Sequence, residues 1–310
     1  GGKIPMLNFG NADLTATGPW VLTSVRERPQ GTKNTFLTGQ FNAHWTINEH
    51  FKLSGGVSYK EYKFATTSLR LVNGESVTAS NAYASLRAVP ISSYVETVSM
   101  ANAGVNIPAG STATWAAPNA ILAAQALGLY TNSTLFALSI QGDLGNNAGV
   151  TERDLGVYLQ GDFSFDLAGR PLKGNIGGRE VRTGQSSTGY LFISGVQTAV
   201  NAARVYHEFL PSLNLSWELA HNFQVRFSAA KVMTRPNLTD LVASTSVSVS
   251  GTSLSVKTGN PNLKPFLANA YDLAFEWYPT SGSILSLALF RKDVTTLVTS
   301  QVQNIPFHNN

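Results

Sequence analysis

The stretch "LPSLNLSWELAHNFQVRFSAAKVMTRP", residues 210–236, consists of two segments in which apolar and polar residues alternate. The apolar positions of the first segment are Leu213, Leu215, Trp217 and Leu219. Those of the second segment are Phe223, Val225, Phe227 and Ala229. A period of two is typical of a β-strand with one apolar face, and residues 220–222 between the segments suit a tight turn. The stretch therefore predicts an antiparallel hairpin, but it leaves open which face meets water.

Other pairs of segments show the same alternation around short turns, at 48–50, 168–170 and 279–283. Together the pairs predict eight strands, or nine if "WVLTSVRER" at 20–28 forms one. Many of these strands exceed the usual length of about 5–6 residues. They satisfy the roughly 9–11 residues that a tilted strand needs to cross a bilayer.

The connections between the predicted hairpins are much longer than the turns within them. They cover residues of about 65–150, 184–203 and 236–265, and a short helix is expected in the first of them from Pro118 onward. Short turns at one end and long loops at the other predict an all-β, antiparallel transmembrane barrel. In such a barrel the short turns are periplasmic and the long loops are extracellular.

Aromatic residues gather beside every short turn. They are Trp45, Phe51, Phe163, Phe165, Trp217, Phe223, Trp277 and Tyr278. Aromatic side chains are enriched at membrane interfaces, where one part of the ring system is apolar and another is wet. The placement predicts an aromatic girdle at the periplasmic rim, with the apolar face of each strand toward lipid.

The composition agrees with a membrane barrel and excludes several other classes. Charged residues make up 13% of the 310 residues, about half the usual share of roughly 25%. The net charge of +4 is scattered, which argues against a nucleic-acid partner. There is no cysteine, so disulfides and thiol chemistry are excluded. No apolar run is long enough for a transmembrane helix, and "GGKIPMLNFG" has no signal-peptide pattern, so a mature or truncated chain is expected.

The sequence contains no recognisable motif for catalysis or for binding a cofactor. The histidines lack metal-ligand spacing, and "GNIGGRE" does not match a nucleotide-binding fingerprint. Asp162 and Asp166 share a strand face at about 13 Å, too far apart for most two-carboxylate mechanisms. The prediction is therefore a protein without enzymatic activity, metal site or cofactor.

Several blocks of the sequence resemble a known family. They are "LPSLNLSWELAHNFQVRFSAAKVMTRPNLTDL", "GNPNLKP", "YDLAFEWYPTSGSILSLALFRKDV" and "LAGRPLKGNIGGREVRTGQSSTGY". Their order and spacing resemble the C-terminal barrel region of TonB-dependent outer-membrane receptors, most clearly over residues 150–298. The motifs at Arg235-Pro236 and 259–265 match the family, and both are interpreted as structural.

The resemblance implies a barrel of about 22 strands that is closed by an N-terminal plug domain and lies in the outer membrane of a Gram-negative bacterium. It implies import of a scarce nutrient, such as a siderophore-iron complex, cobalamin or a saccharide, with energy supplied through the TonB complex. Residues 1–310 contain neither the plug nor a TonB-contacting segment, so they are expected to form part of the barrel domain, with a long extracellular loop at about 65–150. The expected partners are outer-membrane lipid, the plug, the TonB complex and a small-molecule substrate.

Strand direction then assigns candidate site residues on the polar face. Substrate contacts are expected in the extracellular half of the lumen, from Lys60, Tyr62, Asp154, Arg179, Tyr206, Glu208 and Asp272. Contacts with the plug are expected nearer the periplasm, from Asn214, Glu218, Gln224 and Arg226.

Two alternatives to a transporter stay open at this stage. A small outer-membrane barrel enzyme would need a Ser/His or Asp/His constellation near one rim. A soluble or surface-exposed β-rich binding or structural protein would expose its polar face to water and should not need detergent.

Overall fold

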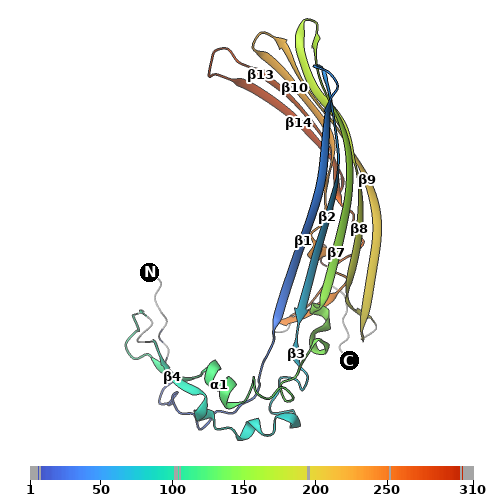
Figure 1. Ribbon diagram of the computed structural model, residues 1–310. Helices are drawn as coiled ribbons and strands as arrows, with labels where there is room; N and C mark the ends of the chain where they lie inside the picture. Colours follow the sequence, from blue (N-terminus) through green and yellow to red (C-terminus); the bar gives the residue numbers. More distant parts are fainter. Residues whose placement is uncertain are drawn as a thin grey trace. The chain divides into compact units, whose positions relative to one another are not determined.

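The computed structural model describes residues 6, 8–100, 104, 106–193, 196–250, 253–300 and 302, and statements about the structure refer to these residues. The chain divides into two compact units. One unit combines Gly1–Gln30 with Ser68–Asp143, and the other combines Gly31–Thr67 with Leu144–Asn310. The second unit contains the large sheet, whose long strands are drawn side by side in Figure 1.

The large sheet is an antiparallel meander, in which each strand pairs with the strands that precede and follow it in the sheet order β1-β2-β7-β8-β9-β10-β13-β14. The eight strands are β1 (Gln30–Thr46), β2 (Phe51–Ser68), β7 (Ala148–Leu167), β8 (Arg170–Ile193), β9 (Val196–Ala220), β10 (Phe223–Thr234), β13 (Phe266–Trp277) and β14 (Leu285–Thr296). The prediction of an all-β antiparallel architecture is confirmed. The sheet is open, because β1 and β14 form its two edges.

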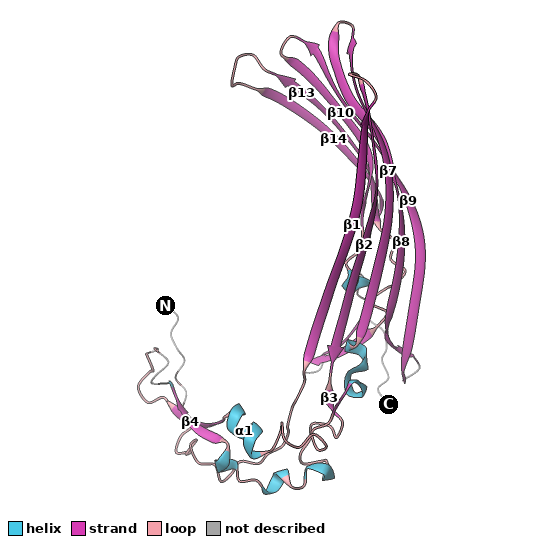
Figure 2. Ribbon diagram, in the orientation of Figure 1, coloured by secondary structure: helices cyan, strands magenta, loops and turns pink. Residues whose placement is uncertain are grey.

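Four short turns lie at the same end of the sheet, which is the upper end in Figure 2. They occupy residues 47–50, 168–169, 221–222 and 278–284. In the second turn Ala168 and Gly169 both have positive φ, of 54° and 72°. This backbone twist matches the twist of the flanking strands in a two-residue hairpin. The predicted hairpins therefore form, with turns at the expected places.

One predicted long connection, at 184–203, is wrong. Strands β8 and β9 continue through this segment and stay paired as far as Ile193↔Val196. The sequence there is rich in Gly, Ser and Thr and has no clear apolar face, which is why it was interpreted as a loop. The pairing continues because the hairpin's backbone hydrogen bonds do not require an apolar side-chain pattern. The segment at 20–28 is not a ninth strand, since its described pairing is a single bridge between Ser24 and Ser76.

The other two connections are long in the structure, and they contain helices and strands of their own. Residues 235–265 include the 3-10 helix η6 (Leu238–Leu241) and a hairpin of β11 (Thr245–Ser250) and β12 (Ser253–Thr258). The first connection contains helix α1 (Ala120–Ala126), which begins just after the predicted position. Asn119 caps this helix by accepting hydrogen bonds from the backbone N–H groups of Ile121 and Leu122.

The two faces of the sheet differ in exposure in the opposite sense to the faces of a sheet in a water-soluble protein. At the end of the polar face that carries the long connections, residues such as Glu152, Asp154 and Thr183 are buried, at only 3%, 4% and 0% exposed, whereas Asn214, Arg226 and Asp272 nearer the short turns are exposed. The apolar face, defined by residues such as Leu155 and Leu159, is exposed at 47% and 59%. Water-soluble proteins bury apolar side chains and expose charged ones. The inversion is the arrangement of a barrel strand, which is apolar outward and polar inward.

The aromatic side chains at the short turns lie on the apolar face, except that of Tyr278, whose hydroxyl donates a 2.8 Å hydrogen bond to Glu276 on the polar face. Register places Phe163 beside Phe51, Trp217 beside Leu172, and Trp277 beside Phe223. The rings of Phe223 and Phe275 stack with centroids 6.4 Å apart. The expected girdle of aromatic residues is therefore present along this rim of the sheet.

Gly174 on the apolar face gives a stability prediction. A Cβ atom there would lie 2.5 Å from the backbone oxygen of Asn214 and 2.7 Å from the ring of Phe163. We expect Gly174→Ala to lower the free energy of unfolding by about 1–3 kcal/mol, because overpacking shifts both neighbours. Urea unfolding of the full-length protein in lipid vesicles measures this change. Gly161→Ala is the matched control, since nothing lies within 4 Å of its Cβ position; equal effects of the two changes would contradict the steric explanation.

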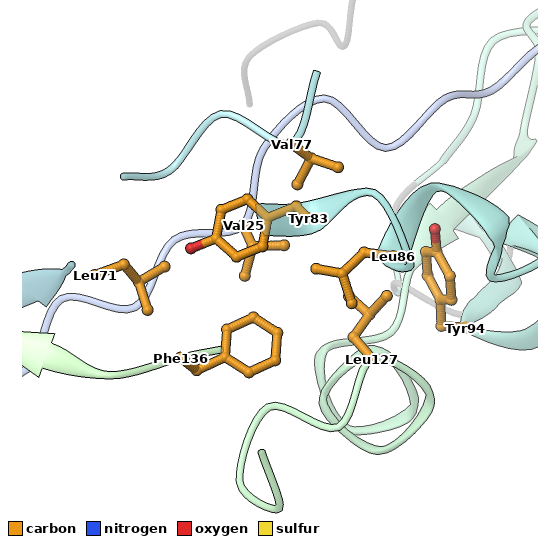
Figure 3. Packing of buried hydrophobic residues seen from close by; sticks show 8 residues of the cluster. All are labelled: Val25, Leu71, Val77, Tyr83, Leu86, Tyr94, Leu127 and Phe136. Atoms are coloured by element: carbon orange, nitrogen blue, oxygen red, sulfur yellow. The ribbon is translucent and has the colours of Figure 1, made fainter. Parts of the chain in front are cut away.

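The first unit has a small hydrophobic core, shown in Figure 3. It consists of Val25, Leu71, Val77, Tyr83, Leu86, Tyr94, Leu127 and Phe136. The rings of Tyr83 and Phe136 stack at 6.1 Å, and the Tyr83 hydroxyl donates a hydrogen bond to the carbonyl of Gly74. The long loop between β2 and β7 is therefore a packed structure together with residues from the N-terminal segment.

A bidentate ion pair between Arg28 and Glu75 ties the N-terminal segment to this loop, with nitrogen–oxygen distances of 2.5 Å. Hydrogen bonds from Arg28 lower the pKa of Glu75 below its ordinary value. The stabilisation is therefore present above the unfolded pKa of about 4.3 and is lost as the pH falls through the lower, folded pKa. We expect limited proteolysis within 68–143 to accelerate at that acidic pH. In Glu75→Gln this acceleration should be weaker, and an unchanged pH profile in the variant would contradict the role of the carboxylate.

Candidate functional site

The polar face of the sheet positions the candidate site residues in continuous cross-strand rows. One row runs through Lys60, Asp154, Thr183 and Tyr206, because each is the register partner of the next. The adjacent row runs through Tyr62, Glu152, Gln185 and Arg204. Both rows lie near the ends of the strands that carry the long connections. The sequence produces them because every second residue of each strand faces the same side.

A buried ionic network lies at the centre of these rows. Arg235, the residue just beyond β10, reaches across β9 and β8 to two carboxylates on β7. Its Nη2 atom lies 2.9 Å from Oδ1 of Asp154, and its Nε atom lies 3.3 Å from Oε1 of Glu152. Thr183 donates a hydrogen bond of 2.6 Å to Asp154, and Gln185 donates one of 2.6 Å to Glu152. Such partners are what buried carboxylates require in order to stay charged.

The network continues into the connection between β10 and β13. Arg204 donates to the side chain of Gln185 at 3.0 Å and to the backbone oxygen of Asn262 at 2.8 Å. Asn260 donates its backbone N–H to the carbonyl of Asp240, which joins the two ends of this connection. The blocks at Arg235-Pro236 and 259–265 therefore have structural contacts, as their interpretation predicted.

Six of the seven proposed substrate residues lie close together. Lys60, Tyr62, Asp154, Arg179, Tyr206 and Glu208 occupy consecutive rows of the polar face. Asp272 lies apart from them, because its register partner on β10 is Ser228, which pairs in turn with Asn214. The structure thus groups Asp272 with the residues proposed to face the plug. Strand direction alone did not show this, because depth along a strand depends on register.

The charged residues among these six differ in whether they form ion pairs. Asp154 is held by Arg235, and Glu208 accepts a 2.9 Å ion pair from Lys231. Among the described residues, Lys60 and Arg179 form no ion pair, and the guanidinium of Arg179 lies 5.7 Å from the ring centroid of Tyr158. These two cations are therefore the charges of the cluster that are available to a ligand.

The residues proposed to face the plug lie toward the short turns. Two of them, Asn214 and Arg226, line a hollow of about 620 Å³ on the polar face, together with Asp162, Lys173, Ser216 and Asp272. Arg226 also forms a 3.0 Å ion pair with Glu276. Gln224 and Glu218 are register partners one row nearer the turn. The arrangement offers a polar surface of both charge signs and no single-sign ion filter.

Sequence reasoning missed several members of the ionic network. Glu152, Gln185, Arg204, Lys231 and the pairing role of Arg235 were not identified. The signal for Glu152 was its place on the polar face two residues before Asp154, since a strand alternates strictly. No signal in the sequence connects Arg235 with β7, because the contact spans three strands.

Within the ranges that the structure describes, no group of three or more His, Asp or Glu side chains is placed to hold a metal ion. None of the helices described is both long and apolar enough to cross a membrane.

Several solved structures resemble this chain. The ferric yersiniabactin uptake receptor FyuA from Yersinia pestis matches 86% of this chain and 29% of its own, at 10% identity and a TM-score of 0.40. The ferric-catecholate import receptor Fiu from K12 E. coli matches 86% and 32%, at 15% identity and a TM-score of 0.42. A mutant ferric enterobactin receptor, PfeA from Pseudomonas aeruginosa, in complex with enterobactin, matches 90% and 45%, at 12% identity and 0.29. The chain thus spans less than half the length of each.

These TM-scores are too low to support conclusions by themselves, and the search of curated proteins gave no match. The match to a family model is extensive. The model described as "TonB dependent receptor-like, beta-barrel" matches residues 8–310, which is nearly the whole chain. Together with the inverted sheet and its aromatic rim, this match shows that the chain belongs to the TonB-dependent receptor-like β-barrel family.

Proposed function

We propose that this chain is the barrel portion of an outer-membrane transporter that imports a scarce nutrient and carries out no covalent chemistry. The observation that supports this most directly is the inverted sheet, with carboxylates such as Asp154 buried and residues such as Leu159 exposed. Burying charges toward the interior while presenting leucine outward is stable only where lipid covers the outside. Membership of the family supports the same function at this coarse level.

In this proposal the substrate contacts the polar face in the rows nearest the long connections. Lys60, Tyr62, Arg179, Tyr206 and Glu208 would touch it directly. Asp154 is almost completely buried and bound to Arg235 and Thr183, so its part would be to hold these rows in position. A siderophore-iron complex, cobalamin and a saccharide are the substrate classes to be compared.

The proposal also assigns the opposite end of the polar face to the plug. Asn214, Glu218, Gln224 and Arg226, now joined by Asp272, would contact a plug domain belonging to the full-length protein. Exchange of energy with the TonB complex would take place through segments outside residues 1–310. Lipid of the outer membrane would cover the apolar face.

Uptake of labelled candidate nutrients tests this function in the native bacterium. We expect deletion of the gene for the full-length protein to abolish uptake of one nutrient, and loss of TonB to abolish the same uptake. The physical reason is that a plugged barrel needs energy to release its substrate inward. Uptake that survives loss of TonB but depends on this protein would contradict an energised transporter and favour a passive pore.

The site is tested by substrate affinity. We expect Lys60→Gln combined with Arg179→Gln to weaken binding of an anionic substrate by about tenfold or more, because a hydrogen bond to a charged group contributes about 1.5–3 kcal/mol. Equilibrium binding to the detergent-purified protein measures this change. Lys173→Gln, which removes a cation near the other end of the polar face, is the control. A larger loss in the control than in the double variant would contradict the location.

A further inference from the structure

The depth of the apolar face can be estimated from the strands. On β7 one apolar position, Leu167, lies beyond the rim residue Phe165 at the turn, and the part of the face between Leu155 and Phe165 spans ten residues. This is roughly 34 Å of extended chain, or roughly 25 Å of depth for a strand tilted by about 40°. Barrels of this kind have an apolar band about 25 Å tall. Leu155 therefore lies near the boundary of the apolar band that is remote from the aromatic rim.

Cations lie on the same face at this boundary. Arg182 is the register partner of Leu155, and Arg153 lies two residues beyond Leu155 on β7. Lys63 lies two residues beyond Glu61, the register partner of Arg153. All three cations are exposed, and the aromatic rim at the other boundary has no comparable group of cations on this face. We refer to Lys63, Arg153 and Arg182 as the boundary cations.

Within the protein the boundary cations are only partly neutralised. Glu61 forms ion pairs of 2.6 Å with both Lys63 and Arg153, so one carboxylate neutralises only one of these two positive charges. Arg182 forms no ion pair with any residue that the structure describes. Glu180, two residues before Arg182 on β8, lies 3.4 Å from His207, which is the register partner of Arg182 on β9. The group therefore has an excess of positive charge beside the lipid-facing band.

An arginine that points toward lipid needs an anionic partner at headgroup depth. Placing Arg or Lys in the hydrocarbon of a barrel is unfavourable, and the penalty vanishes only near the interface. A guanidinium binds phosphate through two parallel hydrogen bonds, whereas a headgroup without phosphate or carboxylate offers no such partner. At this depth, the phosphate of a lipid headgroup is the group that can reach Arg182 and Arg153 together.

We propose that the boundary cations form a binding site for a phosphorylated lipid of the membrane leaflet that faces the long connections. Arg182 binds the phosphate, Arg153 and Lys63 lie beside it, and Glu61 holds these two in place. The acyl chains of the lipid cover Leu155 and Val157 below. The inference rests on the proposed location in the outer membrane, but it does not depend on transport or on the nature of the nutrient.

Native mass spectrometry of the detergent-purified full-length protein tests the proposal. The probes are lipid A, which carries two phosphates, and its dephosphorylated form. We expect lipid A to bind and the dephosphorylated form to bind much more weakly. Arg153→Gln combined with Arg182→Gln should weaken lipid A binding by about 25-fold, that is, about fivefold for each cation. The single change Arg182→Lys should keep the charge and lose only part of the affinity.

The control variant combines Lys52→Gln with Lys173→Gln, which removes the same charge from the polar face and should leave lipid binding unchanged. Resistance of each folded barrel to SDS before heating shows whether a variant has assembled. Equal binding of both lipids, or equal losses in the control and the double variant, would overturn the lipid site. If the lipid site is overturned but the protein still assembles and imports its nutrient, the proposed function stands. If the protein never enters a membrane, the proposed function fails.

Discussion

Leu159→Arg is expected to destabilise the membrane-inserted protein by about 2–4 kcal/mol. Leu159 lies in the middle of the apolar face and is 59% exposed. In a soluble protein, an exposed leucine can be replaced by arginine with a change of about 0.5 kcal/mol or less. In a bilayer the same change places a charge near the midplane of the hydrocarbon. The measurement is urea unfolding of the full-length protein in lipid vesicles, followed by tryptophan fluorescence.

Gln160→Arg is the matched control, because Gln160 is the next residue of β7 and faces the other side of the sheet. Its side chain donates a 2.8 Å hydrogen bond to Asp162, so an arginine there meets a carboxylate. We expect a change of about 1 kcal/mol or less. If Leu159→Arg is as harmless as Gln160→Arg, the apolar face does not contact lipid. The soluble β-rich alternative would then be preferred.

Arg235→Met is expected to lower the free energy of unfolding by about 3–5 kcal/mol. The change removes the cation between Glu152 and Asp154, which are 3% and 4% exposed. Two buried carboxylates would then lose the one cation that pairs directly with both of them, and neutralisation or hydration would have to replace it. The same urea unfolding measurement in vesicles reports the loss.

Two further variants separate this charge effect from a loss of packing. Adding Glu152→Gln and Asp154→Asn to Arg235→Met should restore much of the stability, because no uncompensated charge remains. Arg226→Met should cost only about 0–1 kcal/mol, since the Arg226 side chain in its pair with Glu276 is 51% exposed. If the triple variant is as unstable as Arg235→Met alone, packing or hydrogen bonding of Arg235, and not its charge, explains the loss.

Part of the candidate site was predictable from the sequence because strands alternate. The period of two assigns Lys60, Asp154, Arg179 and Tyr206 to one face without any structure. Their grouping depends on register, and the sequence fixes register only where a tight turn is close. Asp272 shows the limit, because the pairing of β13 with β10 follows a long connection that no local pattern constrains.

The sequence also left one stretch undecided and led to a wrong prediction for another. The run Leu285–Phe290 is nearly apolar on both sides, so its alternation gave no orientation. Pairing with β13 places Leu285, Leu287 and Leu289 on the apolar face, opposite Trp277, Phe275 and Leu273. The segment 184–203 has no alternation, and only the backbone pairing of β8 with β9 shows that it is a hairpin.

The sequence by itself determined the fold class, the four short turns and the two faces of most strands, because these depend on neighbours within a few residues. The tertiary structure alone decided which charges are paired. Arg235 meets Glu152 and Asp154 across β8 and β9, and Arg182, at the edge of the apolar band, forms no ion pair with any residue that the structure describes. Ion pairs between distant segments depend on where the backbone places each side chain, and local alternation contains no information about that distance.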